Sequence, residues 1–166
     1  MTLDEWNERY RSREEIASDP ASLLVDAARD LKPGRALDLA CGAGRNALWL
    51  ASRGWDVVAI DGAEEAIRIL REHDADVDAR VMNLEDETPL PFAAESFDLV
   101  CILYYLHRPL FAEAKRMVKR GGTVVCAVKM TGTHRGEPGE LAQHFEDFEV
   151  LRSSEGEIAE IVARRP

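Results

Sequence analysis

The sequence predicts an α/β protein with a doubly wound, mostly parallel seven-stranded sheet, helices on both faces and an antiparallel C-terminal hairpin. Three observations lead to this class. Short apolar runs alternate along the chain with segments of helical periodicity, as in parallel sheets joined by crossover helices. The run from Phe97 to Leu103 is nearly continuous in apolar residues, which is typical of a central strand covered on both faces. Gly42 and Gly44 form a glycine turn between the first strand and the helix after it.

The individual elements follow in order along the chain. Residues 1–20 are rich in acidic and aromatic side chains and are assigned no element. Apolar residues then recur at helical spacing from Leu23 to Leu31, and Pro33 and Gly34 end that helix. A last hairpin turns near Gly156. Strands are expected at 35–39, 56–60, 77–82, 97–103, 123–128, 148–151 and 158–163, and further helices at 47–51, 63–72, 110–118 and 140–145.

Length and charge limit the possible functions. A chain of 166 residues is interpreted as one domain, residues 1–166, which needs no metal or disulfide for stability. Its net charge of −10 argues against nucleic acid and membrane surfaces as partners. The chain lacks an apolar stretch of roughly 18 residues and a signal-peptide pattern, so a cytoplasmic location is expected. The three cysteines show no metal-ligand spacing and are expected to be reduced and buried.

The glycine turn is flanked by two carboxylates. Glycine at Gly42 and Gly44 allows a tight turn and a close approach of the backbone to a ligand, and the helix start near Asn46 presents unpaired N–H groups to the same place. Asp61 ends the second strand, nineteen positions after Gly42, where an acid can accept hydrogen bonds from ribose hydroxyls. Asp38 lies in the first strand, four residues before Gly42. These residues predict a nucleoside-binding pocket.

Asp38 separates two classes of nucleoside cofactor. Residues 42–47 also fit the dinucleotide fingerprint G-x-G-x-x-G/A, so a nicotinamide or flavin enzyme is a competing interpretation. A carboxylate at Asp38 would repel a negatively charged pyrophosphate and would attract a cationic ligand. The acid therefore favours a positively charged cofactor, and a nicotinamide enzyme ranks third among the hypotheses.

The acid-x-x-x-Gly-x-Gly pattern of Asp38, Gly42 and Gly44 resembles the first motif of the class I S-adenosylmethionine-dependent methyltransferases. Asp61 and the segments 91–100 and 119–122 are similar to further motifs of that family, with Arg120 in place of a proline. The N-terminal segment, the motif Gly42 to Ala47 and residues 105–111 resemble the small bacterial tellurite-resistance and thiopurine methyltransferases. The resemblance implies the Rossmann-like methyltransferase fold and S-adenosyl-L-methionine as cofactor, with S-adenosyl-L-homocysteine as product.

The resemblance also implies a set of cofactor-binding residues. Asn83 stands where family members often have an acid against the adenine, with Asp86 as a nearby competitor. Residues 1–20 are expected to form a lid over the cofactor. The residues expected to contact the cofactor are Trp6, Arg9, Tyr10, Asp38, Cys41, Gly42, Gly44, Asn46, Asp61, Gly62, Asn83, Leu84 and Leu103.

The methyl acceptor is expected to be a small molecule near Tyr104, Tyr105 and His107, which follow the fourth strand. An amine or hydroxyl acceptor would need one of these three side chains to take its proton. A soft thiol or metalloid nucleophile needs no base, because proximity can supply about 7 to 11 kcal/mol of the barrier, and it is favoured. The alternative is a noncatalytic S-adenosylmethionine-binding module or partner subunit. Monomer and homodimer both remain open.

Overall fold

The computed structural model describes residues 1–13, 16–86 and 88–166. A seven-stranded sheet has the order β3-β2-β1-β4-β5-β7-β6, and β7 runs antiparallel to both of its neighbours. This arrangement confirms the predicted fold class. The strands are β1 (Arg35–Leu39), β2 (Asp56–Asp61), β3 (Val77–Val81), β4 (Phe97–Leu103), β5 (Val118–Lys129), β6 (Glu149–Ser154) and β7 (Ile158–Arg164).

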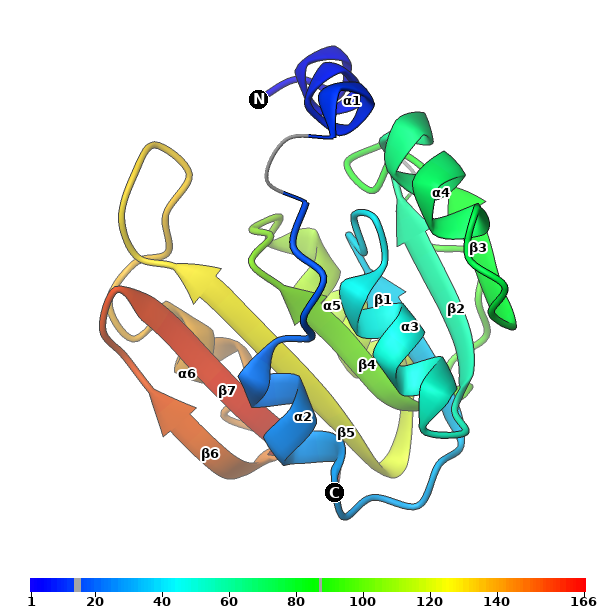
Figure 1. Ribbon diagram of the computed structural model, residues 1–166. Helices are drawn as coiled ribbons and strands as arrows, with labels where there is room; N and C mark the ends of the chain where they lie inside the picture. The colour runs from blue at the N-terminus through cyan, green and yellow to red at the C-terminus, as the bar shows by residue number, and fades with distance from the viewer. Residues whose placement is uncertain (14–15, 87) are drawn as a thin grey trace.

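Helices cover both faces of the sheet (Figure 1). On one face, α2, α3 and α4 contribute apolar residues to one core cluster, and on the other, α5 and α6 contribute to a second. Helix α1 lies beyond the carboxyl ends of the strands, on neither face (Figure 1). The helices are α1 (Leu3–Ser12), α2 (Ser22–Ala28), α3 (Arg45–Ser52), α4 (Glu64–Arg71), α5 (Pro109–Met117) and α6 (Glu140–His144).

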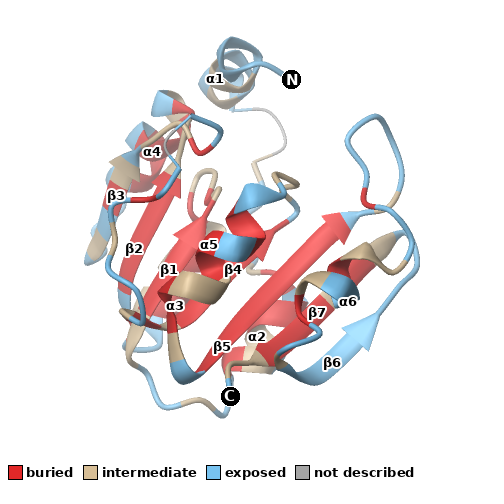
Figure 2. Ribbon diagram, turned by 180° about the vertical axis from the view of Figure 1, so that it is seen from behind, coloured by how far each residue is buried: buried red, intermediate tan, exposed pale blue. Residues whose placement is uncertain are grey.

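The core follows from the alternation of side chains along the central strands. In β1, Leu37 and Leu39 join the cluster under α5 and α6, whereas Ala36 joins the cluster under α2 to α4. Strands β1, β4 and β5 are largely buried, while the edge strand β6 is exposed along its whole length (Figure 2). Cys41, Cys101 and Cys126 are unpaired and buried, as predicted. Within the described residues, no helix has the length and apolar character needed to cross a bilayer.

Helix α1 is the main element without a sequence prediction. A capping box begins it, in which Thr2 Oγ1 accepts from the Glu5 N–H at 3.2 Å and the Glu5 carboxylate accepts from the Thr2 N–H at 2.6 Å. None of its ten residues is buried. Its apolar residues are few, with Leu3, Trp6 and Tyr10 on one face among mostly charged and polar neighbours, so its periodic signal is weaker than that of the core helices.

Strand β5 begins earlier than the predicted 123–128. Val118 pairs with Phe97, but the next pair joins Thr123 to Leu99, so the chain bulges outward between the two pairs. Gly121, with a φ of 76°, lies within this bulge. The glycine pair that predicts a turn is therefore a bulge inside a longer strand, because tertiary pairing continues across it.

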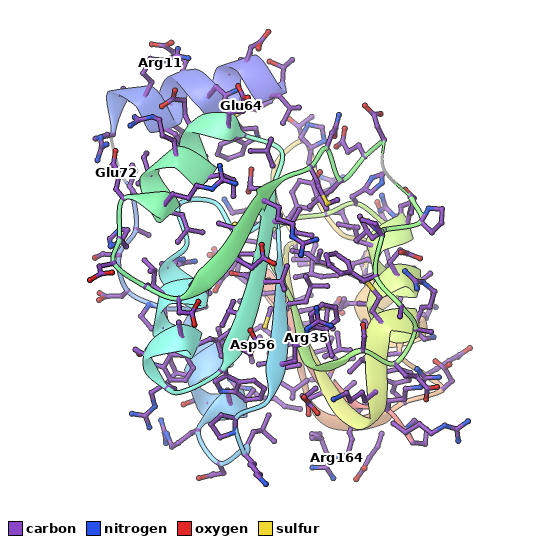
Figure 3. All side chains as sticks on the ribbon, turned by 90° about the vertical axis from the view of Figure 1, so that its right-hand side faces the viewer. Arg11, Arg35, Asp56, Glu64, Glu72 and Arg164 are labelled. Carbon is purple, nitrogen blue, oxygen red and sulfur yellow. The ribbon has the colours of Figure 1, made fainter. Side chains whose placement is uncertain are left out.

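The strand order places the functional site. The chain runs outward through β1, β2 and β3 and returns to β4, which pairs with β1 on its other side. Ligands of doubly wound sheets bind at such a reversal, outside the carboxyl ends of the strands. Arg35 and Asp56, which begin β1 and β2, lie at the end of the sheet opposite to α1 and Glu64, which begins α4 (Figure 3). Helix α1 thus covers the edge where a ligand is expected.

Candidate functional site

A cavity of about 660 Å³ opens at the carboxyl ends of the parallel strands. Its walls come from α1 and from the segments that follow β1, β2, β3 and β4, together with the end of β5. The predicted site residues that line it are Trp6, Arg9, Tyr10, Cys41, Gly42, Gly44, Asn46, Asp61, Gly62, Asn83, Leu84, Leu103, Tyr104 and Tyr105. Asp38 and His107 are not among the lining residues.

The glycine turn forms the floor of this cavity. Gly42 and Gly44 have φ values of 56° and 93°, which β-carbon-bearing residues adopt only with strain. A β-carbon at Gly42 would lie 2.6 Å from the Tyr10 hydroxyl, so glycine also allows α1 to approach the turn. Gly44 precedes α3, whose first N–H groups face the same region.

Asp61 binds the glycine turn to the end of β2. One carboxylate oxygen accepts from the Gly42 N–H at 2.8 Å, and the other accepts from the Ala63 N–H at 2.8 Å. Burial raises the pKa of Asp61, and these two N–H groups oppose the increase. Each carboxylate oxygen retains a second acceptor position, so Asp61 can still accept hydroxyl protons from a ligand in the cavity.

Asp38 lies beneath the glycine turn with only 1% of its surface exposed. Its Oδ2 atom has no hydrogen-bond partner among the described residues. Burial, followed by the nearby charge of Asp61, raises the pKa of Asp38 to about 7, although Arg45 and the Ala47 N–H lower it. A buried acid without a full set of partners is costly in a folded protein. It is explained if a cationic ligand group or a ligand donor binds above the turn.

Asn46 has a structural role beside its place in the cavity wall. Its Oδ1 atom accepts from the Ala21 N–H at 2.8 Å, and the side chain is buried. The amide thereby joins the start of α3 to the start of α2, while its remaining N–H groups can face a ligand. The sequence interpretation assigned only the second of these roles.

The segment after β3 contains the predicted adenine contacts, and two hydrogen bonds fix the Asn83 side chain there. The Asn83 amide donates to the Asp86 carboxylate at 2.6 Å and accepts from the Glu85 N–H at 3.2 Å. Asn83 and Leu84 line the cavity, whereas Asp86, the competing candidate, does not. Asp86 instead orients the Asn83 side chain, which leaves Asn83 as the candidate for the base.

Helix α1 brings aromatic side chains over the glycine turn. The rings of Trp6 and Tyr10 stack with centroids 6.1 Å apart, and the Arg9 guanidinium lies 5.4 Å from the Trp6 ring centroid. Burial and the charge of Asp61 raise the pKa of Tyr10 to about 12, so its hydroxyl is protonated at neutral pH. Leu3 packs beside Gly62, where a β-carbon would lie 2.8 Å from Leu3 Cδ2.

The end of β4 holds the predicted acceptor residues. Tyr104 has a φ of 63°, is 38% exposed and lies under the Arg45 guanidinium, which is 5.5 Å from its ring centroid. The Tyr105 hydroxyl donates to Glu85 at 3.2 Å, and burial together with that carboxylate raises the Tyr105 pKa well above its ordinary value. His107 lies outside the cavity, and its Nε2 atom is buried without a partner among the described residues.

Three charged lining residues were not predicted as site residues. These are Arg45, Glu85 and Lys129. Arg45 begins α3 and Lys129 ends β5, so both occupy positions where an α/β fold exposes side chains to its ligand. The place of Lys129 directly after the expected strand 123–128 was the available signal, but its position beside the end of β4 depended on the strand order.

A glycine turn and two carboxylates at the carboxyl ends of parallel strands form the arrangement expected for a cationic nucleoside ligand such as S-adenosylmethionine. The profile of the family described as a methyltransferase domain matches residues 37–126, more than half of the chain. The protein therefore belongs to the methyltransferase domain family, and the resemblance to the class I S-adenosylmethionine-dependent methyltransferases is confirmed. The cofactor of this class is S-adenosylmethionine, as predicted.

Individual relatives agree with this assignment. The chain is 36% identical over 110 residues to demethylmenaquinone methyltransferase from Renibacterium salmoninarum, across 63% of this chain and 45% of the relative. It is 26% identical over 148 residues to a Haemophilus influenzae protein named as a probable S-adenosyl-L-methionine-dependent methyltransferase, TehB, across 80% of this chain and 52% of the relative. The chain thus spans about half the length of these curated relatives.

Solved structures show the same fold. TehB from Haemophilus influenzae aligns with a TM-score of 0.80 at 22% identity, across 96% of this chain and 67% of that chain. Geranyl diphosphate C-methyltransferase from Streptomyces coelicolor aligns with a TM-score of 0.72 at 16% identity, across 86% and 77% of the two chains. That structure was solved in complex with S-adenosyl-L-homocysteine.

Proposed function

We propose that this protein transfers the methyl group of S-adenosylmethionine to a small-molecule acceptor, with a soft thiol or a metalloid nucleophile favoured. The observation that carries the proposal is the buried Asp38 carboxyl, four residues before Gly42, which lacks a partner on one oxygen among the described residues. The sulfonium and amino groups of S-adenosylmethionine are cationic, and a carboxylate stabilises positive charge in a site shielded from water.

The cofactor would be held by groups from successive strand ends. Asp61 would accept from the ribose hydroxyls, the Asn83 amide would bind the adenine, and Gly42 and Gly44 would allow the backbone to approach the ligand. When bound, the cofactor supplies an activated methyl group on a positively charged sulfur. The residues of this chain contribute orientation and exclusion of water, which together account for a large part of such rate enhancements.

The acceptor side supports a nucleophile that needs no general base. The Tyr105 hydroxyl donates to Glu85 and its pKa is raised, so it stays protonated at neutral pH and cannot take a proton from an acceptor. His107 does not line the cavity, and Tyr104 is 38% exposed, with no carboxylate shown to orient its hydroxyl within the described residues. A thiolate or a metalloid anion arrives already deprotonated or with lone pairs available, so positioning is sufficient. Tyr104 is proposed to contact the acceptor rather than to take its proton.

Helix α1 is proposed to act as the lid over the cofactor. Two hydrogen-bonded contacts tie α1 and its C-cap to the domain at the periphery: Asn7 Oδ1 accepts from the Glu65 N–H at 3.0 Å, and Arg13 donates to both Glu72 oxygens at 2.8 and 2.9 Å. Because none of its residues is buried, little free energy holds α1 in place. A bound cofactor beneath Trp6 and Tyr10 would add the missing contacts.

Arg13→Gln should loosen this lid. The Arg13–Glu72 pair is about half exposed, so its loss should lower the free energy of unfolding by less than about 1 kcal/mol. Amide hydrogens of α1 should exchange faster, and the S-adenosylhomocysteine Kd should rise by about two- to fivefold. Hydrogen-exchange mass spectrometry and titration calorimetry measure the two effects. Arg29→Gln is the matched control, because Arg29 forms a comparable exposed pair with Asp26 on another helix. Equal behaviour of both variants would argue against the lid.

Titration calorimetry with S-adenosylhomocysteine tests the donor site. The variant Asp61→Asn tests the role of the Asp61 carboxylate in that site. We expect saturable binding to the wild type and a Kd raised about 10- to 100-fold in the variant, since hydrogen bonds to a charged acceptor contribute about 1.5 to 3 kcal/mol. Asp56→Asn, at the exposed start of the same strand, is the control and should bind as the wild type does. Absence of saturable binding to the wild type at millimolar ligand would refute the proposed function.

Turnover tests the acceptor class. Release of S-adenosylhomocysteine is followed with thiols, selenite, tellurite, amines and phenols in separate reactions. We expect product with thiols or metalloid oxyanions and none with amines or phenols. Cofactor binding without turnover on any acceptor would instead support the noncatalytic binding module.

A further inference from the structure

The cavity carries cationic side chains on the wall formed by β4, β5 and α3. Lys129 is the last residue of β5, and Tyr104 follows β4, which is the neighbouring strand. The Tyr104 N–H donates to the Ala127 carbonyl at 2.7 Å, so the two chain segments run together to the cavity edge. Arg45 reaches the same wall from the start of α3, with its guanidinium 5.5 Å from the Tyr104 ring centroid. Lys129, Tyr104 and Arg45 therefore belong to one side of the cavity.

Neither of these two cations forms an ion pair with a carboxylate within the described residues, although the charge of Arg45 acts on the nearby Asp38. Most arginines outside the cavity form ion pairs with Asp or Glu, as Arg13, Arg68 and Arg116 do. Arg45 donates only to the Asp19 carbonyl at 3.2 Å and stacks on Tyr104, and the Lys129 ammonium makes no hydrogen bond or ion pair with the described part of the chain. An exposed cation at the rim of a cavity is thus available to a ligand.

The carboxylates of the cavity are already assigned to other partners. Asp61 accepts from the Gly42 and Ala63 N–H groups on the β2 side, and Glu85 accepts from the Tyr105 hydroxyl. Among the described residues, Lys129 therefore remains a cavity cation without a carboxylate partner, in a chain whose net charge is −10. Local cations in such a field attract an anionic ligand to one place and give selectivity against neutral analogues.

We infer that Lys129 selects a methyl acceptor that carries a negatively charged group of its own beside the nucleophile, with Arg45 supporting it from α3. This inference rests on the proposed function and adds the charge of the substrate to it. Lys129 is a binding residue in this role. The Lys129 side chain is long and flexible, so its ammonium can reach a charged group of the acceptor at various distances from the nucleophilic atom.

The test compares two thiols that differ in one charge, 3-mercaptopropionate and 3-mercaptopropionamide. Each is titrated into ¹⁵N-labelled protein saturated with S-adenosylhomocysteine, and the Kd is taken from amide shifts at the ends of β4 and β5. The wild type should bind the acid about fivefold more tightly than the amide, as expected for a partly exposed ion pair. Lys129→Met should remove that preference, and Lys129→Glu should reverse it. Where turnover is measurable, the same ratios should appear in KM, with kcat unchanged.

Lys32→Met is the matched control, because Lys32 is exposed in the loop before β1, at the other end of the sheet. It removes the same charge and should keep the wild-type preference for the acid. An equal Kd for acid and amide in the wild type, or a preference that survives in Lys129→Met, would overturn the inference. A weakened affinity for S-adenosylhomocysteine in Lys129→Met, with no change in the acid-to-amide ratio, would assign Lys129 to the donor and would equally overturn it. Failure of S-adenosylhomocysteine to bind the wild type is a separate result, which refutes the proposed function itself.

Discussion

Asp38→Asn should flatten the pH dependence of the stability of the ligand-free protein between pH 5 and pH 8. The pKa of Asp38 is raised to about 7 in the folded state, by burial and then by Asp61, from an ordinary value of 3.8. As the pH rises above that ordinary value, the unfolded chain releases the proton while the folded chain holds it, so the folded state loses relative stability. The loss from pH 5 to pH 8 should be about 2 to 3 kcal/mol in the wild type.

The same variant should bind the cofactor more weakly. Removal of the charge beneath the glycine turn should raise the Kd of S-adenosylmethionine by about 10- to 100-fold. Wild-type affinity should increase as the pH rises through 7, because the carboxylate form of Asp38 binds the cationic ligand, and this increase should be absent in the variant. Urea unfolding and calorimetry at pH 5, 6, 7 and 8 measure both effects. If the ionised Asp38 stabilises the bound cofactor but destabilises the empty fold, cofactor affinity should rise with pH while the stability of the ligand-free protein falls.

Asp98→Asn is the control for the pH profile. Although burial opposes it, hydrogen bonds from the Arg35 N–H and Lys119 lower the pKa of Asp98. The stability that Asp98 contributes is present above its ordinary pKa and is lost only as the pH falls below it. Asp98→Asn should therefore keep the wild-type decline between pH 5 and pH 8. Parallel profiles for the wild type and Asp38→Asn would contradict the assignment of that decline to Asp38.

Gly44→Ala should destabilise the protein by about 3 kcal/mol, because it combines backbone strain with overpacking of a core side chain. Gly44 has a φ of 93°, and a β-carbon there would lie 2.3 Å from Leu70 Cδ1. Leu70 is buried on α4, so it cannot move without disturbing the cluster around it. The displaced turn should also weaken S-adenosylhomocysteine binding by more than about tenfold, since donor geometry sets the hydrogen bonds of the site.

Gly132→Ala separates the two contributions. Gly132 has a similar φ of 89°, but nothing lies within 4 Å of the position of its β-carbon. Its substitution should cost about 1 kcal/mol through backbone strain alone. Thermal and urea unfolding of both variants measure the difference. If Gly44→Ala were no more destabilising than Gly132→Ala, contact with Leu70 would not be the reason for glycine at Gly44.

Local patterns were sufficient for most elements of the sheet. The predicted bounds of β1 and β4 agree with the structure, since a buried strand is an apolar run that begins and ends at polar or turn residues. The bulge near Gly121 and the exposed helix α1 were not recognised. The bulge depends on pairing with β4, and α1 is mostly charged or polar with only three apolar residues on one face, so neither leaves a strong periodic signal in the sequence.

Side-chain positions in the site depended on contacts between distant segments. Asp38 and Asp61 were identified as acids of one pocket, but burial of Asp38 beneath the turn depends on the helices packed around β1. The bond from Asn46 to the Ala21 N–H and the bond from Tyr105 to Glu85 join residues far apart in the chain. His107 follows the expected strand but is not among the residues that line the cavity. Such pairings are set by packing and not by spacing.

The sequence by itself determined the class of fold and the donor, because strand periodicity, the glycine turn and the acid four residues before it are local features with direct physical meaning. Only the tertiary structure decided which charges line the cavity. Arg45, Glu85 and Lys129 come from three separate segments that meet at the carboxyl ends of the strands. A charge acts through its distance to other charges, and those distances exist only once the chain has folded.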